Sequence, residues 1–167
     1  MELVEGRPQD KRIDKEERVY DLLDQLNIDY QRIDHEEANT MEVCLEIEKT
    51  LKSTICKNLF LVNSNKSQYY LLMLKENKKF KTKVISKQIN SSRLSFGSDE
   101  KMLEYLDITP GSVSLLGLMN DHDFKVQLLM DKDLLQDEYL GCHPCINTSS
   151  LRIKMKDVFE KSYHPSS

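Results

Sequence analysis

The chain has 167 residues, of which 39% are apolar and 31% charged, with a formal net charge of −4. This composition is typical of one soluble globular domain, and no apolar run approaches the roughly 18–20 residues needed to span a bilayer. Because the first residues also lack the apolar core of a signal peptide, we expect a cytoplasmic protein. The acidic balance argues against a protein that binds nucleic acid over its whole surface, but not against a local basic face.

Residues 1–13 are polar and are expected to form a flexible lead-in. Over residues 15–27, apolar side chains then recur at helical spacing, at Val19, Leu22, Leu23 and Leu26. Asp14, with Glu17 three residues later, has the spacing of a helix cap and its partner. We therefore predict an amphipathic helix whose apolar stripe faces the core.

Residues 29–34 predict a short strand, which is followed by a polar loop at residues 35–40. At the end of this loop, Asn39 or Thr40 can cap a second helix. Three of that helix's residues share one face: Met41, Cys44 and Leu45.

Residues 54–63 have the apolar density of a strand, and residues 68–75 are its expected hairpin partner. By the two-residue period of a strand, Lys57 shares a face with Ile55, Leu59 and Leu61. Because an unpaired buried ammonium group is costly, Lys57 must leave the sheet at its end or point into a wet cleft. A lysine that snorkels from the start of the strand fits the spacing equally well.

A run of lysines follows, opposed only by Glu76: Lys75, Lys78, Lys79, Lys81, Lys83 and Lys87. Such a run is usually a solvated face, but lysines are also general phosphate contacts in nucleic-acid-binding proteins. Charge alone leaves both interpretations open. Apolar residues within the same region predict a short helix there: Val84, Ile85 and Ile89.

Residues 92–96 predict a short strand, after which Ser98 can cap a helix. The buried side of that helix is expected to carry Met102, Leu103 and Leu106. Pro110 and Gly111 then make a turn. The run of small and apolar residues at 111–118 allows the backbone to approach another element or a ligand closely.

Residues 124–130 and 151–153 predict strands, and residues 131–136 predict a helical turn. A last helix is marked by Met155, Val158 and Phe159. Strands and helices mix without a steady βαβ alternation, which favours a single α/β domain with a mixed, largely antiparallel sheet flanked by helices. The sequence has no Gly-rich nucleotide-binding loop and no Gly-x-Ser-x-Gly elbow.

Polar chemistry is densest in residues 141–151, which include Cys142, His143, Cys145, Asn147 and Thr148. A redox dithiol belongs at the start of a helix, whereas the residues after Cys145 have the pattern of a loop and then a strand. A zinc site would need a second closely spaced pair of ligands, which the chain lacks. We therefore expect no metal and no cofactor, reduced cysteines, and a binding or catalytic loop built from His143, Asn147 and Thr148.

Three short segments, taken together, resemble the prolyl-tRNA editing domains of the YbaK/ProX type. They are residues 57–61 (Lys-Asn-Leu-Phe-Leu), residues 111–114 (Gly-Ser-Val-Ser) followed by Asn120-Asp121, and His143-Pro144 followed by Asn147-Thr148. The resemblance runs from about Val19 to Phe159. It implies the fold of that family, in a freestanding editing domain at residues 14–163 with a tail at 164–167.

The resemblance also implies a function, namely hydrolysis in trans of the ester that links a wrong amino acid to proline tRNA. Alanine is the expected amino acid, and the expected partners are the acceptor end of the mischarged tRNA and prolyl-tRNA synthetase. The resemblance implies a metal-free mechanism in which water attacks the ester and the ribose hydroxyl of the substrate assists. An ester is a reactive bond, so positioning and oxyanion stabilisation can suffice.

The resemblance gives individual residues a role. The catalytic residues are expected to be Lys57 and Asn58. The substrate pocket is expected to contain Thr40, Met41, Ser114, Gly141, His143, Asn147 and Thr148. The lysine run supplies the candidate contacts to tRNA phosphates, which are Lys78, Lys79, Lys81 and Lys83.

The sequence departs from the family pattern at three positions. Many relatives have Pro where Leu115 stands, an apolar residue at Cys142 and Leu at Cys145. The change at Leu115 bears on the pocket floor, so the rejected amino acid is open among alanine, cysteine and serine. Two alternatives to an editing enzyme also remain: a catalytically silent module that binds tRNA or a synthetase, and a thiol oxidoreductase using Cys142 and Cys145.

Overall fold

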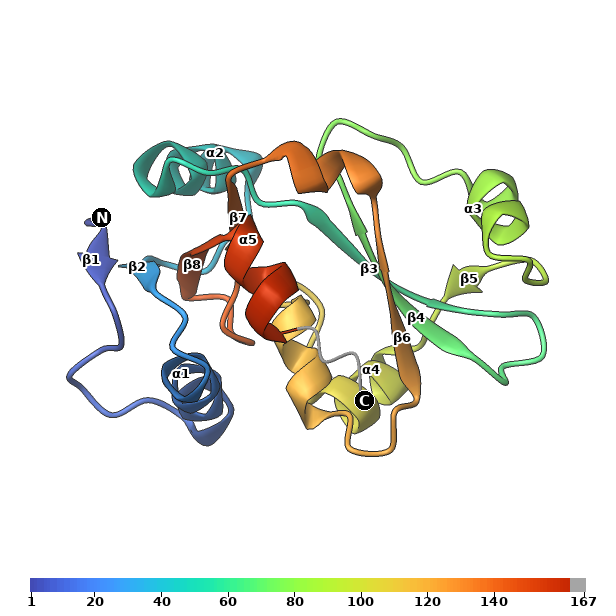
Figure 1. Ribbon diagram of the computed structural model, residues 1–167, viewed down its shortest axis with the longest axis horizontal. Coiled ribbons are helices and arrows are strands. Elements are labelled where there is room, and N and C mark those ends of the chain that lie inside the picture. Colours follow the sequence, from blue (N-terminus) through green and yellow to red (C-terminus); the bar gives the residue numbers. More distant parts are fainter. Residues whose placement is uncertain (163–167) are drawn as a thin grey trace.

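The computed structural model describes residues 1–162, and its strands form two four-stranded sheets within that range (Figure 1). The first sheet has the order β1-β2-β8-β7, with bounds Val4–Glu5, Tyr30–Asp34, Ser149–Lys154 and Tyr139–Cys142. The second has the order β5-β3-β4-β6, with bounds Ser95–Phe96, Lys57–Val62, Tyr69–Leu74 and Val126–Met130. β4 pairs with β6 in parallel and the other pairings are antiparallel. The predicted mixed, largely antiparallel α/β class is confirmed, with the strands divided between two sheets instead of forming one.

The helices lie on the two sides of these sheets. Figure 1 shows α2 (Met41–Leu51) and α3 (Thr82–Gln88) along one side, and α1 (Asp14–Gln25) and α4 (Asp99–Leu106) along the other. The remaining helical segments are short: η1 (Leu115–Asn120), η2 (Lys132–Gln136), and α5 (Met155–Asp157) continuing into η3 (Val158–Ser162). None of the helices within residues 1–162 is long and apolar enough to cross a membrane.

Three apolar clusters follow from the alternation of side chains along the strands. The largest contains Val19 and Leu23 of α1, Phe60 of β3 and Leu151 of β8. On the opposite face of β3, Leu61 packs with residues of β4 and with Ile85 of α3. The third cluster joins α2 to the first sheet through Ile33, Ile47 and Leu51. Each sheet therefore has its own helix on the α2 and α3 side, while the main core lies on the other side.

The two sheets meet at a parallel backbone bridge between Ile55 and Gly141. Both chains continue from it in the same direction, into Cys56 and Cys142, which are both buried in the main core. Successive residues of an extended chain point to opposite faces. The bridge therefore determines which residues share a face on each side of the junction.

Two predicted helix caps are confirmed. The Thr40 hydroxyl accepts a hydrogen bond from the Val43 amide at 3.2 Å, and the Ser98 hydroxyl accepts one from the Lys101 amide at 3.1 Å. The predicted cap at Asp14 is wrong, because the helix is preceded by Ile13, which makes no side-chain cap.

One prediction about packing differs from the structure. Leu103, expected on the buried side of its helix, is exposed on α4. On α2, Ile47 and Leu51 form the packed side, and Met41 and Leu45 are 79% and 59% exposed.

The N-terminal segment is attached to the domain, contrary to the flexible lead-in expected at residues 1–13. Val4 of β1 pairs with Arg32 of β2. Arg12 donates to both carboxylate oxygens of Asp34, at 3.1 and 3.0 Å, and to Glu16 at 3.0 Å. The expected tail at residues 164–167, with the last residue of the expected domain, lies outside the described residues.

Candidate active site

Lys57 begins β3 and lies on the side of the sheets that carries α2 and α3. Its side chain is exposed, and its ammonium group donates to the main-chain carbonyl of Lys78. This hydrogen bond gives the ammonium group a partner, so the cost of an unpaired buried charge does not arise. The lysine therefore leaves the sheet at its start, with its charged end in water.

Asn58 points to the opposite face of β3, as the alternation requires. Its amide donates to the carbonyl of Cys56 at 3.3 Å, within the same strand. Its side-chain oxygen lies 3.9 Å from the Cys56 sulfur, on the side of the main core. The structure thus separates the two residues expected to act together at the reaction centre.

The bridge at Ile55 and Gly141 brings Lys57 towards the predicted loop at residues 143–148. Lys57 and His143 each lie two residues beyond the bridge, in chains that run the same way. Because Cys56 and Cys142 both enter the main core, the alternation directs Lys57 and His143 to the same face. No hydrogen bond joins the two side chains within residues 1–162, so they share a face without forming a contact pair.

His143 is half-buried and held through one edge of its ring. Its Nδ1 lies 3.0 Å from the carbonyl oxygen of Ser149 and 3.3 Å from the hydroxyl of Ser150. The Ser150 hydroxyl also lies 2.9 Å from Nε2 of His35. Burial lowers the pKa of His143; the Ser149 carbonyl opposes this shift, and the nearby His35 adds to it. The imidazole is therefore neutral at neutral pH.

The loop at residues 143–148 is attached to the loop before α2. The Ala38 amide donates to the side-chain oxygen of Asn147 at 3.3 Å, and the His35 amide donates to the Thr148 carbonyl at 3.0 Å. These two contacts attach Asn147 and Thr148 to the loop that ends at Thr40. Thr40 caps α2, and Met41 is left exposed beside it.

Two predicted pocket residues have structural roles instead. Gly141 is buried against the chain itself: an added Cβ would lie 2.8 Å from the Thr54 carbonyl, so the close approach it allows is to Thr54. The Ser114 side chain is fully buried, and its hydroxyl accepts the Leu116 amide at 3.1 Å as the cap of η1. Neither residue offers a side-chain atom to a substrate.

The four candidate phosphate contacts divide into two kinds. Lys78 forms ion pairs with Asp131 at 2.8 Å and Asp133 at 2.5 Å, which neutralise it. The other three are exposed on or near α3: Lys79, Lys81 and Lys83. A groove of about 790 Å³ runs beneath α3, floored by apolar residues such as Leu72 and Ile89 and bordered by Lys79 and Lys81. The basic surface therefore consists of the exposed lysines at this groove.

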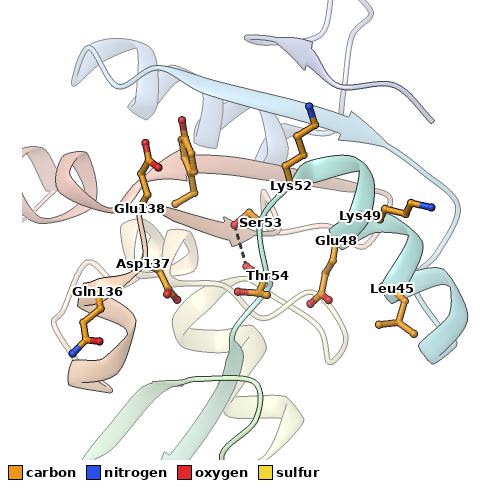
Figure 2. A pocket seen from close by; sticks show the side chains of 10 residues that line it. Leu45, Glu48, Lys49, Lys52, Ser53, Thr54, Gln136, Asp137 and Glu138 are labelled. Atoms are coloured by element: carbon orange, nitrogen blue, oxygen red, sulfur yellow. Dashed lines mark hydrogen bonds between the residues drawn. The ribbon is translucent and has the colours of Figure 1, made fainter.

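A second pocket, of about 630 Å³, lies on the other side of the bridge (Figure 2). Figure 2 shows it between the end of α2 and residues 136–139, with Glu48, Asp137 and Glu138 facing it. Its lining contains none of the residues predicted from the sequence. Its mixed charges and its separation from His143 leave it outside the candidate site.

The cysteines of residues 142–145 are free thiols in the core. Cys142 is 1% exposed and Cys145 is fully buried. Burial raises the pKa of Cys142, and it raises the pKa of Cys145 to about 12. Because the thiolate is the reactive form, this environment argues against the dithiol alternative.

Sequence reasoning missed two residues of the site, His35 and Ser150. His35 lies in the predicted polar loop at residues 35–40, and Ser150 lies in the polar segment 141–151. Their side chains are in contact although they lie 115 residues apart, and no sequence motif predicts a contact over that separation. The pairing of β2 with β8, which sets Ile33 opposite Ser150, brings them together.

Comparison with known proteins identifies the family to which the chain belongs. The sequence profile of the aminoacyl-tRNA editing domain matches residues 35–161. The prolyl-tRNA editing protein ProX of Acetoanaerobium sticklandii is 32% identical over 146 residues, which cover 87% of this chain and 89% of that protein. The prolyl-tRNA synthetase associated domain-containing protein 1 of Danio rerio is 25% identical over 148 residues, covering 87% and 80%.

A solved structure of a candidate trans-editing enzyme for prolyl-tRNA synthetase has the same fold. It superposes with a TM-score of 0.69 at 14% identity, over 92% of this chain and 96% of that one. The profile match and the identity to ProX both extend over most of the chain, and the residues that the profile matches include His35 and His143. The chain therefore belongs to the aminoacyl-tRNA editing domain family, in its YbaK/ProX branch.

Proposed function

We propose that this protein hydrolyses the aminoacyl ester of a mischarged tRNA in trans, with alanine on proline tRNA as the expected substrate. Family membership and the names of its relatives support the reaction class. The observation that carries the proposal is the placement of Lys57 and His143 on one face, on opposite sides of the Ile55–Gly141 bridge. That face combines a cation with a neutral imidazole.

In the proposed reaction, a water oxygen bonds to the ester carbonyl carbon and the bond to the ribose oxygen breaks. The ribose oxygen takes a proton and leaves as the terminal hydroxyl of the tRNA, and the amino acid is released. Lys57 stabilises negative charge, either on the terminal phosphate or on the oxygen of the tetrahedral intermediate. His143 borders the aminoacyl group, with Met41 and Thr40 across the loop.

The exposed lysines beside the α3 groove are proposed to contact phosphates of the acceptor end. They lie on the same side of the sheets as Lys57, because Leu74 pairs with Lys57 in register and the groove extends from the end of that strand. Prolyl-tRNA synthetase is the proposed partner, since it supplies mischarged proline tRNA.

A panel of proline tRNAs charged with alanine, cysteine or serine tests the proposal. We expect hydrolysis of the alanyl ester to be faster than that of the other two, with release of free amino acid measured over time. Preference for cysteine or serine would overturn the assigned amino acid but not the reaction. Tight tRNA binding without hydrolysis of any ester would favour the catalytically silent module.

A further inference from the structure

His35, Ser150 and His143 form a continuous hydrogen-bonded chain, and their partners fix the direction of every bond. A carbonyl oxygen can only accept, so Nδ1 of His143, 3.0 Å from the Ser149 carbonyl, must carry a proton. In the same way, Nδ1 of His35 must donate to the Glu36 carbonyl at 2.7 Å. In its neutral form, each ring therefore has an unprotonated Nε2.

The Ser150 hydroxyl connects the two rings. Because Nε2 of His35 is an acceptor, the Ser150 hydroxyl donates to it at 2.9 Å. The hydroxyl oxygen is then free to accept from Nδ1 of His143 at 3.3 Å. Ser150 is fully buried, so water cannot readily replace it in this role.

Nε2 of His143 is left as the one open position of the chain. It makes no hydrogen bond within the described residues, yet it is not sealed from solvent. The lone pair at this nitrogen is thus available to a water molecule or a substrate group.

We propose that Ser150 and His35 are positioning residues that act with the Ser149 carbonyl to hold His143 in the Nδ1-protonated tautomer, so that its Nε2 accepts the proton of the water that attacks the ester. The inference rests on the proposed deacylation. As the water oxygen bonds to the carbonyl carbon, its proton passes to Nε2. The same proton is returned to the ribose oxygen as the ester bond breaks, so no co-reactant is needed.

The network differs from general packing in what it controls. Burial of the ring alone would allow either tautomer, whereas the contacts of Nδ1 with Ser149 and Ser150 select the Nδ1-protonated one. The charged groups nearest the network lie behind Ser149, whose hydroxyl donates to Asp34 at 2.5 Å and accepts from Arg12 at 3.3 Å. These groups pair with each other, so His35 is the titratable neighbour that faces the ring of His143.

Nitrogen-15 spectra of the histidine side chains test the tautomer without reference to activity. In the folded wild-type protein we expect the His143 ring to carry its proton on Nδ1. Ser150→Ala and His35→Phe leave Nδ1 with less support than the full network gives, so the Nε2-protonated fraction should rise although the Ser149 carbonyl still favours Nδ1. His35→Gln, whose amide oxygen can still accept from Ser150, should keep the wild-type signal. An Nε2-protonated ring in the wild type would overturn the proposal.

Deacylation rates of the same variants test the catalytic consequence. We expect His143→Gln to lower kcat about 100-fold, and Ser150→Ala and His35→Phe to lower it about tenfold with little change in KM. His35→Gln should recover most of the loss. His122→Gln, at an exposed turn outside the network, is the control for histidine replacement.

The outcomes separate this inference from the proposed function. An active wild type with unchanged kcat in the Ser150 and His35 variants would refute the positioning role and leave the deacylase intact. An inert wild type would refute deacylation and with it the role of water at Nε2. Urea unfolding of each variant identifies any loss that is due to unfolding.

Discussion

At the scale of single residues, Lys57 has the most direct test. We expect Lys57→Ala to lower kcat/KM by about 100-fold or more, because the cation that stabilises developing negative charge is removed. Lys57→Arg should retain part of the activity. Lys125→Ala, at an exposed site before β6, is the matched control for loss of a lysine. Near-normal rates in Lys57→Ala would contradict the assigned role.

The sequence alone singled out several candidate site residues, but it did not reveal the hydrogen bonds that those residues make. Lys57, His143 and Thr40 stood out through a period-two pattern, a dense polar loop and a cap position. Ser114 and Gly141 contact their own fold, and a motif does not reveal whether a small residue meets a ligand or the fold itself. His35 depends on Ser150, a contact created only when β2 pairs with β8.

At the scale of elements, the cap of α2 links stability to the site. Thr40→Ala should destabilise the fold by about 1 kcal/mol, since it removes the hydrogen bond to the Val43 amide. Ser98→Ala removes the equivalent cap of α4 and is the matched control. We expect similar falls in the urea midpoint for both variants, but a fall in deacylation for Thr40→Ala alone. Equal activity in the two would separate α2 from the site.

The attachment of the N-terminal segment to β2 predicts a pH dependence of stability. Burial acts to raise the pKa of Asp34, but hydrogen bonds from Arg12, Ser149 and Arg32 hold it well below its usual range. A carboxyl group with a depressed folded pKa stabilises above its unfolded pKa of about 3.9, and this stabilisation is lost as the pH falls through the folded value.

The wild-type urea midpoint should therefore fall more steeply than that of Asp34→Asn as the pH is lowered from about 5 to about 2. Over this range the unfolded protein takes up the Asp34 proton before the folded protein does. At neutral pH the variant should be the less stable protein. Asp29→Asn, an exposed position just before β2, is the control and should follow the wild type. Parallel curves for wild type and Asp34→Asn would contradict the assigned ion pairs.

Periodicity predicted most elements, because the spacing of apolar residues along a helix or a strand reflects which side of that element is buried. It could not predict that β1 would pair with β2, since two residues carry no periodic signal. The predicted burial of Leu103 is also wrong. Its apolar character matched a buried side, but Met102 and Leu106 form that side without it.

At the scale of the whole molecule, charge distribution predicts how tRNA binding responds to salt. The chain is acidic overall, so contact with phosphates depends on a local surface. Replacing Lys79, Lys81 and Lys83 with alanine should reduce the slope of log affinity against log salt by about 2–3, as expected for the loss of about three phosphate contacts.

The matched control replaces three exposed lysines elsewhere, namely Lys11, Lys154 and Lys156. Lys78 is left unchanged in both variants because Asp131 and Asp133 already neutralise it. The salt dependence of tRNA affinity measures the difference. Identical slopes for the two triple variants would show that the α3 groove is not the phosphate-binding surface.

The close approach of Gly141 to Thr54 joins the two sheets at a point where no side chain fits. A methyl group at Gly141 would act as a wedge between the sheets, because the atom it meets at 2.8 Å belongs to the backbone and cannot rotate away. The chains on either side of that wedge are those that carry Lys57 and His143 two residues later. A side chain at position 141 would therefore change the spacing between the segments that carry Lys57 and His143 while leaving both residues in place.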